Sequence, residues 1–494
     1  MKSPLKMLAF DLGASSGRAI IGCFDGEKLA TEEICRFPND PVNIRGHLHW
    51  DILRLYHEIK QGMLKCSNSS NKDICSMAID TWGVDFSLLD KEGYLLSNPY
   101  HYRDMLTDNI MEEVFSIIPK SELYNLTGQQ FMKFNTVFQL YAMKYHDYTS
   151  LREADMLLMM PDTFNYFLTG VKAAEYTVAS TTQLLDAAGR NWSGEVISKL
   201  QLPHNIFPEI VKPGTILGAI SPEIRQECGI GAIPVIAAAS HDTASAVASV
   251  PADNDGFVYI SCGTWSLMGV EADHPIISEK SYALSYANEG GVNSKIRFLK
   301  MIMGLWLIQE SRRQWNREGI NYSFPDLDIL ASKAVPFKSF INPDDEIFMS
   351  PGNLPLRIAE YCRNTGQSIP EGIGETVLCI VQSLALKYRM TVESLEEILG
   401  KKLPSIHMVG GGIKDRMLCQ FTANATGRVV YAGPIEATAT GNLMVQAMAL
   451  GEVGNLNELR QVVKKSFPVE TYTPCNNEQW GDAYFRFKKI IEKV

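Results

Sequence analysis

The chain has 494 residues, of which 46% are hydrophobic, 21% charged and 10% aromatic, and this is the composition of an ordinary globular protein. A single hydrophobic core stops growing at roughly 250 to 300 residues, so the length predicts two domains with a cleft between them. The net charge of −10 excludes a broad basic field for binding nucleic acid or an anionic membrane.

The first residues, MKSPLKMLAFDLG, reach an aspartate too early for the core of a signal peptide, and no apolar run approaches the roughly 18 residues of a membrane span. The ten cysteines form no CxxC pair, and no histidine cluster has the spacing of a zinc site. We therefore expect a cytoplasmic protein whose cysteines are reduced core residues.

Strand and helix patterns alternate along the chain. Short, mostly apolar strands are expected, in chain order, at 7–13, 76–90, 233–240, 256–263, 405–412 and 428–434. Helical periodicity is found at 51–65 and 376–400. Turn residues at Asp25 and Asp90 predict that the first strands of the N-terminal half form hairpins, which gives mixed sheets. The alternation predicts an α/β fold.

The segments FDLGASSGRAII and ISCGTWSLMGV share one plan: a strand, a glycine, small or hydroxyl residues and a second strand. Their glycines, Gly13 and Gly263, are separated by about half the chain. Two related domains joined near residues 250–256, each offering a glycine-rich hairpin to a common cleft, would explain the similarity. Chance similarity between two β-hairpins is the alternative.

The turn from Gly13 to Arg18 has the composition of an anion site. Its small residues allow backbone N–H groups to converge on a phosphate, while two serine hydroxyls and Arg18 add donors. Asp11, at the end of the preceding strand, can hold Mg²⁺ directly or through water. The pattern suits a nucleoside triphosphate with a metal, although it is neither a Walker loop nor a GxGxxG motif. A plain hairpin with a surface arginine is the alternative.

The segment 234–250 runs from an apolar strand through Ser240, His241, Asp242 and Thr243 into a helix of small residues. Asp242 lies in or next to the first helical turn, where the helix dipole favours its ionised form. An ionised carboxylate at the end of a strand can accept a proton from a substrate hydroxyl. The alternatives are a helix-capping aspartate and a core histidine, and without spaced partners we expect no zinc site.

Asp80, Trp82, Gly83 and Asp85 interrupt an otherwise apolar strand. Polar residues and a tryptophan beside a glycine indicate close approach by another group, and a sugar suits a ring face bordered by carboxylates. The nearby segment His101–Asp104 adds further hydrogen-bonding groups. Core packing of Trp82 and a bulge or turn at Asp85 remain the alternatives.

In the C-terminal half, Gly410, Gly411 and Gly412 follow a strand and precede a helix. Three glycines leave room for an adenine or ribose ring to lie against bare backbone. A tight turn without a ligand is the alternative.

In this order, the segments resemble the FGGY family of carbohydrate kinases, within the superfamily of actin, hexokinase and the 70-kilodalton heat-shock ATPases. The resemblance covers essentially the whole chain and is carried by FDLGASSGR, HWDI, DTWGVDF, HYRD, SHDTASAV, GTWSLMGVE, NEGG, GLWLIQE and GPIEATATGN. It implies two actin-like (ribonuclease H-like) ATPase domains with mixed sheets, at 1–248 and 249–494, and ATP in the interdomain cleft.

The resemblance also implies roles for individual residues, with Asp242 as the catalytic base. ATP contacts are expected at Ala14, Ser15, Ser16, Gly17, Arg18, Thr264, Gln309 and Gly411. Sugar contacts are expected at Gly83, Arg103, His241, Asp242 and Thr243, and Asp11 is the expected Mg²⁺ ligand.

The family members that these segments resemble most convert L-rhamnulose to L-rhamnulose 1-phosphate in L-rhamnose catabolism. The alternatives are a sibling kinase for L-fuculose, xylulose or glycerol and a non-kinase actin-like ATPase. Two residues depart from the pattern, because Met301 stands where an asparagine is usual and Asp415 stands where an amide is usual. The expected partners are the sugar and ATP, with no nucleic acid and no membrane.

Overall fold

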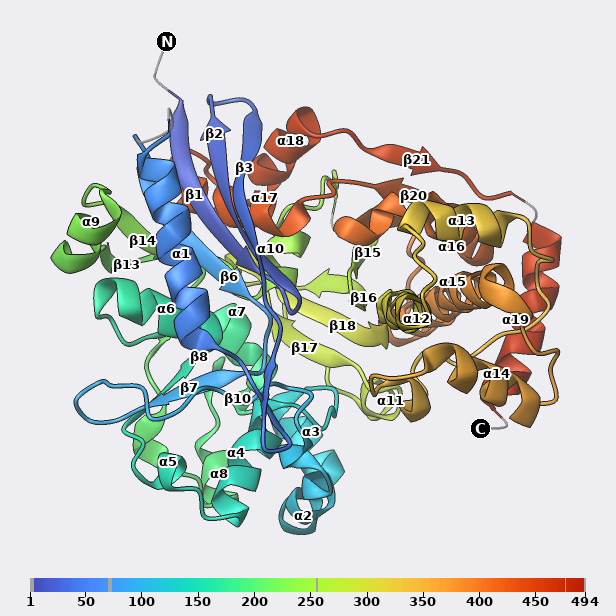
Figure 1. Cartoon of the computed structure of the whole chain (residues 1–494), viewed down its shortest axis with the longest axis horizontal. Coiled ribbons are helices and arrows are strands. Elements are labelled where there is room, and N and C mark those ends of the chain that lie inside the picture. Colours follow the sequence, from blue (N-terminus) through green and yellow to red (C-terminus); the bar gives the residue numbers. More distant parts are fainter. Residues whose placement is uncertain (1–3, 70–72, 255, 476, 493–494) are drawn as a thin grey trace. The chain divides into compact units, whose positions relative to one another are not determined.

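The computed structural model describes residues 4–69, 73–254, 256–475 and 477–492. The chain forms two compact units (Figure 1). Unit 1 comprises Met1–Asp253, Glu271–Leu299 and Ala437–Phe467, and unit 2 comprises Asn254–Val270, Lys300–Glu436 and Pro468–Val494. Unit 1 thus combines the first half of the chain with two segments from the second half. The predicted domain division at 248/249 stays a prediction.

Unit 1 contains a mixed sheet with the strand order β13-β14-β6-β1-β2-β3. β1 (Leu5–Leu12) pairs antiparallel with β2 (Ser16–Phe24) and parallel with β6 (Ser76–Thr81). β14 (Pro234–Ala237) is parallel to β6, and β3 (Leu29–Pro38) is antiparallel to β2. The predicted α/β fold with mixed sheets is therefore confirmed in this unit.

The other elements of unit 1 are the edge strand β13, further short strands and the helices. They are β4 (Val42–Ile44), β5 (His47–His49), α1 (Ile52–Ser67), β7 (Phe86–Leu89), η1 (Met105–Thr107), α2 (Ile110–Ile117), α3 (Lys120–Thr127), α4 (Thr136–Tyr145), α5 (Thr149–Arg152), β8 (Met156–Met159), α6 (Met160–Thr169), β9 (Ala174–Glu175), α7 (Tyr176–Ala179), η2 (Ser180–Thr182), β10 (Leu185–Asp186), β11 (Asn191–Trp192), α8 (Gly194–Lys199), η3 (His204–Ile206), β12 (Ile210–Val211), β13 (Thr215–Ala219), α9 (Pro222–Cys228), α10 (Asp242–Ala248), α11 (Glu279–Ala283), β17 (Ala287–Gly290), η4 (Val292–Ser294), α17 (Ala437–Ala449) and α18 (Leu456–Ser466).

Both faces of this sheet are buried, because the side chains of β1 alternate between two hydrophobic cores. Leu8 and Phe10 pack in the core that includes α1 and α6, whereas Met7 and Ala9 pack in the core that includes α10 and α17. Figure 1 shows α1 across one face of the strands. α1 begins at Asp51, whose side chain caps the helix.

The strand predicted at 76–90 is interrupted, and in this respect the prediction is wrong. β6 ends at Thr81 and β7 begins at Phe86. Between them Val84 adopts a left-handed backbone conformation with φ of 66°, which a continuous strand does not allow. The chain therefore leaves the main sheet here, and β7 pairs with β8 instead.

Unit 2 repeats the central plan of unit 1. β15 (Phe257–Cys262) pairs antiparallel with β16 (Trp265–Ala272) and parallel with β19 (Ser405–Val409), as β1 does with β2 and β6. β20 (Val429–Ala432) and β21 (Glu470–Tyr472) extend the sheet beyond β19. This shared plan accounts for the similarity between the hairpin sequences at Gly13 and Gly263.

The helices of unit 2 are built around α15 (Gly372–Leu399), which is buried on all sides from Thr376 to Tyr388. The others are α12 (Trp306–Arg317), α13 (Phe324–Ser332), η5 (Glu346–Phe348), α14 (Leu354–Asn364), η6 (Gly411–Lys414), α16 (Arg416–Thr426) and α19 (Asn477–Ile491). Of the helices in the described part of the chain, none is long and apolar enough to cross a membrane. None of the ten cysteines, all of which lie in the described part of the chain, forms a disulfide, and Cys475 is exposed, so the expectation that every cysteine is a core residue is wrong there.

The strands β17 and β18 (Ile296–Met303) form a hairpin whose part up to Leu299 belongs to unit 1. It is anchored there by hydrogen bonds to the region between β6 and β14. Asn288 N donates to Gly128 O at 2.9 Å, and Gly290 N donates to Ser180 Oγ at 2.7 Å. Residues of this hairpin are thereby fixed next to the loop that follows β14.

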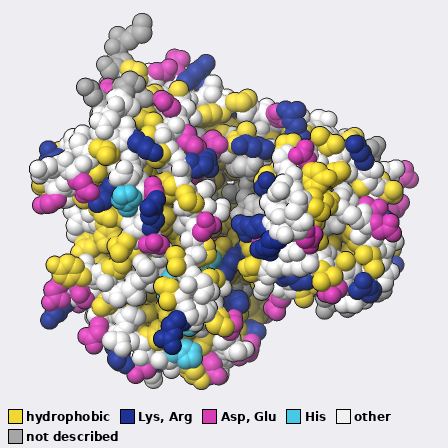
Figure 2. Space-filling view, viewed as in Figure 1, with side chains coloured by type: hydrophobic (Ala, Val, Ile, Leu, Met, Phe, Trp, Pro, Cys, Tyr) yellow, Lys and Arg dark blue, Asp and Glu magenta, His cyan; other side chains and the backbone are white. Residues whose placement is uncertain are grey.

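Acidic and basic side chains are interspersed on the face of the molecule shown in Figure 2.

Helix α17 packs directly on α10, the helix that begins with Asp242. The contact requires Gly441, because a Cβ at this position would lie 1.8 Å from the backbone oxygen of Ser245. We expect Gly441→Ala to lower the free energy of unfolding by at least about 2 kcal/mol, as overpacking of a rigid contact does.

The matched control is Gly481→Ala on α19, where an added Cβ meets no atom within 4 Å. That variant should gain about 0.5–1 kcal/mol, because alanine is the better helix former. Urea denaturation of both variants provides the measurement. Equal free energies of unfolding of the two variants would show that α10 and α17 can move apart without loss of stability.

Candidate functional site

The hairpin of β1 and β2 contains the predicted ATP contacts Ala14 to Arg18, of which Ala14 and Ser15 lie in the turn and the others begin β2. Gly13 N donates to Ser16 O at 3.0 Å, and the side chain of Asn39 donates to Gly13 O at 2.8 Å. These bonds close the base of the turn, while Ser15 at its tip is exposed. The backbone around the tip is therefore preorganised and accessible to an anion.

Asp11 and Arg18 face each other in the pairing of β1 with β2. Arg18 Nε and Nη2 donate to Asp11 Oδ2 at 2.9 and 2.7 Å. Between the turn and Arg18, Gly17 has no room for a side chain, because a Cβ would lie 2.2 Å from the ring of Phe37. The guanidinium of Arg18 is thus held in one position by Asp11, the predicted Mg²⁺ ligand.

Asp80 lies beside Asp11 on the adjacent parallel strand β6 and is fully buried. Burial raises the pKa of Asp80 well above its usual range, and the nearby carboxylates of Asp11 and Asp242 raise it further. Asn442 Nδ2 donates to Asp80 Oδ2 at 2.6 Å, whereas the buried Oδ1 has no hydrogen-bond partner among the described residues. This end of the sheet therefore gathers three carboxyl groups.

A ladder of side chains supports Asp80 from α17. Ser76 Oγ donates to Gln446 Oε1 at 2.7 Å, and Gln446 Nε2 donates to Asn442 Oδ1 at 2.8 Å. Each donor points toward the next acceptor, so the ladder ends with Asn442 donating to the carboxyl group. All members of the ladder are buried. The ladder therefore stabilises Asp80 with its Oδ2 as a hydrogen-bond acceptor.

These carboxyl groups fit a Mg²⁺ ion that is held mainly by phosphate and water. Mg²⁺ in proteins usually keeps several waters and takes one or two carboxylates together with substrate phosphates. Within residues 4–69, 73–254, 256–475 and 477–492, no group of three or more His, Cys, Asp or Glu side chains could hold a metal by itself. The unpartnered Oδ1 of Asp80 and the mutual repulsion of the carboxylates favour a cation near Asp11.

The loop after β14 leads to Asp242, and hydrogen bonds donated by the backbone of the loop fix its position. Ser240 N donates to Glu175 Oε2 and His241 N donates to Thr177 Oγ1, both at 3.1 Å. The helix cap itself is His241, and Asp242 is the first helical residue. Asp242 is therefore not the cap of α10, and its carboxylate is available for another role.

The Asp242 carboxylate is held through one oxygen. Thr243 N and Oγ1 donate to Asp242 Oδ1 at 2.5 and 3.1 Å, and His241 Nε2 lies 3.3 Å from the same oxygen. The side chain is 31% exposed. Loss of surrounding water raises the pKa of Asp242, and Asp11 raises it further, while His241 and Thr243 lower it. A raised pKa makes a carboxylate a stronger base, which suits proton abstraction.

The predicted sugar contact Gly83 is required by packing, because a Cβ there would lie 2.8 Å from Thr181 Oγ1. The same hydroxyl accepts from Val84 N at 3.0 Å. Arg103 is half-buried, and its guanidinium lies over the ring of Tyr102 at 5.3 Å from the centroid. Thr181 was not predicted, and it fixes the strand break next to Gly83.

Asp85 is fully buried at the centre of an aromatic cluster. It accepts hydrogen bonds from Trp50 Nε1 at 2.6 Å, Trp82 Nε1 at 2.9 Å, Gln139 Nε2 at 2.9 Å and Tyr102 N at 3.2 Å. Burial raises the pKa of Asp85 to about 7, and these donors oppose the rise. Of the two interpretations of Asp85, the structure favours a structural role over a contact with sugar.

Unit 2 brings its three predicted ATP contacts into one region. Thr264 Oγ1 donates to Gln309 Oε1 at 3.3 Å. Cβ atoms at Gly410 and Gly412 would crowd Cys262, next to the turn that carries Thr264, whereas a Cβ at Gly411 would meet nothing within 4 Å. Gly410 and Gly412 are therefore needed for packing, and the bare backbone of Gly411 is open.

The two residues that depart from the family pattern lie in unit 2. Asp415 caps α16 by accepting from Leu418 N at 2.8 Å, and burial raises its pKa to about 6. Aspartate caps a helix about as well as asparagine, so the departure preserves the local structure. Met301 lies on β18 and is half-buried.

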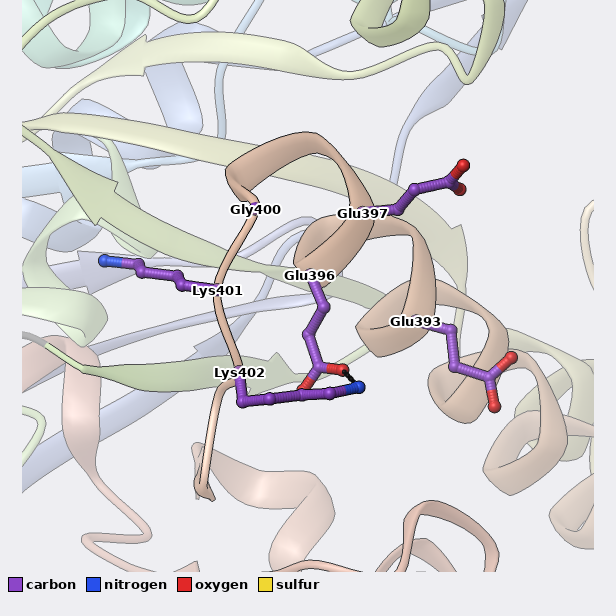
Figure 3. A pocket seen from close by; sticks show the side chains of 6 residues that line it. All are labelled: Glu393, Glu396, Glu397, Gly400, Lys401 and Lys402. Carbon is purple, nitrogen blue, oxygen red and sulfur yellow. Dashed lines mark hydrogen bonds and ion pairs between the residues drawn. The ribbon is translucent and has the colours of Figure 1, made fainter.

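A surface cavity of about 300 Å³ lies at the end of α15. Its lining consists of Glu393, Glu396, Glu397, Gly400, Lys401 and Lys402. Figure 3 shows Glu396 and Lys402 pointing toward each other, and their Oε2 and Nζ are 2.7 Å apart. None of the predicted site residues lines this cavity, and Glu396 in its wall is already paired with Lys402.

Several residues that shape the site were missed by sequence reasoning. Asn442 and Gln446 carried a usable signal, because two amides spaced by four positions interrupt an apolar helix. No such sequence signal marked Glu175, Glu289 and Arg297, because their roles arise only from contacts between distant segments.

The two halves of the chain match known family models. Residues 6–248 match the N-terminal domain of the FGGY family of carbohydrate kinases, and residues 258–450 match its C-terminal domain. Similar proteins include a rhamnulokinase of Bacteroides thetaiotaomicron, 46% identical over 98% of this chain and 99% of its own. A rhamnulokinase of Bacillus subtilis is 42% identical over 94% of this chain and 95% of its own.

Solved structures show the same fold at low sequence identity. A gluconate kinase from Lactobacillus acidophilus matches with a TM-score of 0.82 and 15% identity, over 99% of this chain and 98% of that chain. A xylulose kinase from Rhodospirillum rubrum matches with a TM-score of 0.78 and 15% identity, over the same shares. At this identity the matches concern the fold alone.

Asp85 accepts from four hydrogen-bond donors, so a substitution that removes its charge tests whether Asp85 organises the aromatic cluster. Asparagine would present an amide N–H to at least one of these donors, so we expect Asp85→Asn to lower the free energy of unfolding by about 1–3 kcal/mol. Urea denaturation at neutral pH measures the effect. Asp25→Asn is the control, because this exposed aspartate accepts only from backbone N–H groups of its turn. If both variants match the native protein in stability, Asp85 does not organise the cluster.

Proposed function

The chain belongs to the FGGY family of carbohydrate kinases, and we propose that it transfers a phosphoryl group from ATP to L-rhamnulose, giving L-rhamnulose 1-phosphate and ADP. The observation that supports this substrate is the similarity, at 38 to 46% identity over 94 to 98% of the chain, to relatives named rhamnulokinases. Phosphoryl transfer needs positioning and charge neutralisation more than covalent chemistry, and the polar groups described above are suited to both tasks.

Asp242 acts as the general base in this proposal. Its Oδ1 is occupied by Thr243 and His241, so Oδ2 accepts the proton of the primary hydroxyl of the sugar. The sugar oxygen then forms a bond to the γ-phosphorus as the bond to the ADP oxygen breaks. The raised pKa of Asp242 supports this role.

Each unit carries proposed ATP contacts. In unit 1 the hairpin residues Ala14–Arg18 supply backbone N–H groups, hydroxyls and a guanidinium for phosphates, and in unit 2 Thr264, Gln309 and Gly411 bind the nucleotide. A Mg²⁺ ion at Asp11 would neutralise phosphate charge. The closed base of the turn and the open face of Gly411 support these assignments.

The sugar contacts are Gly83, Arg103, His241 and Thr243, together with Asp242. Gly83 and Arg103 belong to the segments that border the aromatic cluster around Asp85, and a rigid ring-bearing wall suits a sugar. Met301, in place of a polar side chain, removes one hydrogen-bonding group from unit 2.

The assignment of the base is tested by Asp242→Asn. This substitution removes the proton acceptor and keeps the size of the side chain, so we expect kcat for sugar phosphate formation at saturating ATP to fall by about 10² to 10⁴-fold. The control is Asp51→Asn, because Asp51 caps α1 and asparagine caps equally well. Turnover within a few-fold of the native enzyme in a folded Asp242→Asn protein would remove Asp242 as the base.

The proposed substrate is tested by measuring ADP release with L-rhamnulose, L-fuculose, D-xylulose and glycerol, and without sugar. We expect kcat/KM to be highest for L-rhamnulose by at least about tenfold, because hydroxyls that a buried site binds are costly to lose. A higher value for another acceptor would identify a sibling kinase. ADP release that does not depend on any sugar would contradict kinase activity and favour an actin-like ATPase.

A further inference from the structure

Behind the loop that carries Asp242 lies a buried group of charges to which the proposed function assigns no role. Arg297 on β18 is fully buried, and Glu289 on β17 is almost fully buried. Arg297 Nη2 lies 2.9 Å from Glu289 Oε2, and Arg297 Nε donates to Gly290 O at 2.7 Å. The neighbouring guanidinium holds the pKa of Glu289 below its usual value despite burial. Two fixed partners therefore orient the guanidinium.

The same guanidinium reaches His241, and this contact determines where the imidazole proton lies. Arg297 Nη2 is 2.9 Å from His241 Nδ1. A guanidinium has donors only, so Nδ1 must accept, and the proton of the neutral ring is on Nε2. Nε2 lies 3.3 Å from Asp242 Oδ1, so a proton on Nε2 attracts this oxygen. Together with the two donors of Thr243, this attraction holds Oδ1 and leaves Oδ2 without a partner among the described residues.

The opposite tautomer is also within reach. Glu289 Oε2 lies 3.4 Å from His241 Nδ1. Without the donor of Arg297, a proton on Nδ1 would donate to this carboxylate. The lone pair of Nε2 would then face Asp242 Oδ1, and the two would repel each other. Arg297 thus favours the tautomer of His241 that attracts Asp242 over the tautomer that repels it.

We propose that Arg297 is a positioning residue of the transfer reaction, which fixes His241 in its Nε2–H tautomer so that His241 orients Asp242. This inference rests on the proposed function, because Asp242 is the base of that reaction. Arg297 itself touches neither substrate in this proposal. It acts through His241, as residues behind a functional histidine commonly do.

The tautomer is measured directly by two-bond ¹⁵N–¹H correlation spectra of the histidine rings, which distinguish Nε2–H, Nδ1–H and doubly protonated imidazole. The signal of His241 is assigned by its absence from His241→Gln. We expect the Nε2–H pattern in the native protein at neutral pH. Any other pattern for His241 overturns the inference, whether or not a variant of Arg297 folds and whether or not the protein phosphorylates L-rhamnulose.

Variants of the buried charges provide the second measurement. Arg297→Met removes the donor and should shift His241 to the Nδ1–H pattern and lower kcat by about 10- to 100-fold, the usual effect of losing a group that orients a functional histidine. Arg297→Lys keeps a cationic donor and should retain the Nε2–H pattern and part of kcat. Glu289→Gln breaks the same ion pair but leaves Arg297 as the donor, so the Nε2–H pattern should remain.

Arg460→Met is the matched control. Arg460 is also buried and paired, with Glu271, and it contacts the other end of α10 at Val247 O. This variant should lose stability but keep the Nε2–H pattern and kcat. If Arg297→Met changes kcat no more than Arg460→Met does in folded, active protein, Arg297 is only a structural residue. If the native protein phosphorylates no sugar, the proposed function fails, while the spectra still decide the tautomer.

Discussion

Repulsion among carboxyl groups at one end of the unit 1 sheet is the constraint on which the site depends. The parallel strands β1 and β6 place Asp11 and Asp80 side by side, and the loop after β14 adds Asp242. In surroundings of low polarity such charges repel strongly, and Asp11 raises the pKa of both Asp80 and Asp242. Each group is therefore supplied with its own donor: Arg18 for Asp11, Asn442 for Asp80 and Thr243 for Asp242.

The donors hold one oxygen of a carboxyl group and leave the other unused. Asp80 Oδ1 and Asp242 Oδ2 have no hydrogen-bond partner within the described residues. An unused acceptor in a buried or half-buried carboxyl group is costly unless a ligand completes it. The cost is compensated when a cation, a proton or a substrate hydroxyl arrives, so the arrangement favours binding of such ligands over the empty state.

The groups that hold the site come from distant parts of the chain and are themselves well satisfied. Glu175 accepts from Ser240 N and from backbone groups of α7, which fixes the loop before Asp242. The hairpin β17–β18 contributes Arg297 to unit 1, and α17 contributes Asn442. Because these anchors lie on strands and helices, the geometry at Asp242 does not depend on a mobile side chain.

The sequence by itself determined the alternation of strands and helices, the two related hairpins at Gly13 and Gly263, and the residues whose type implies chemistry, such as Asp242 at a strand end and the small residues before Arg18. These features are local, because propensity, periodicity and glycine spacing are expressed within a few residues. Only the tertiary structure decided that Asp85 is structural, that the strand breaks at Val84, and that Arg297 meets His241. Buried partners separated by 35 or 56 positions are chosen by packing and hydrogen-bond satisfaction in the folded chain, and no local pattern encodes them.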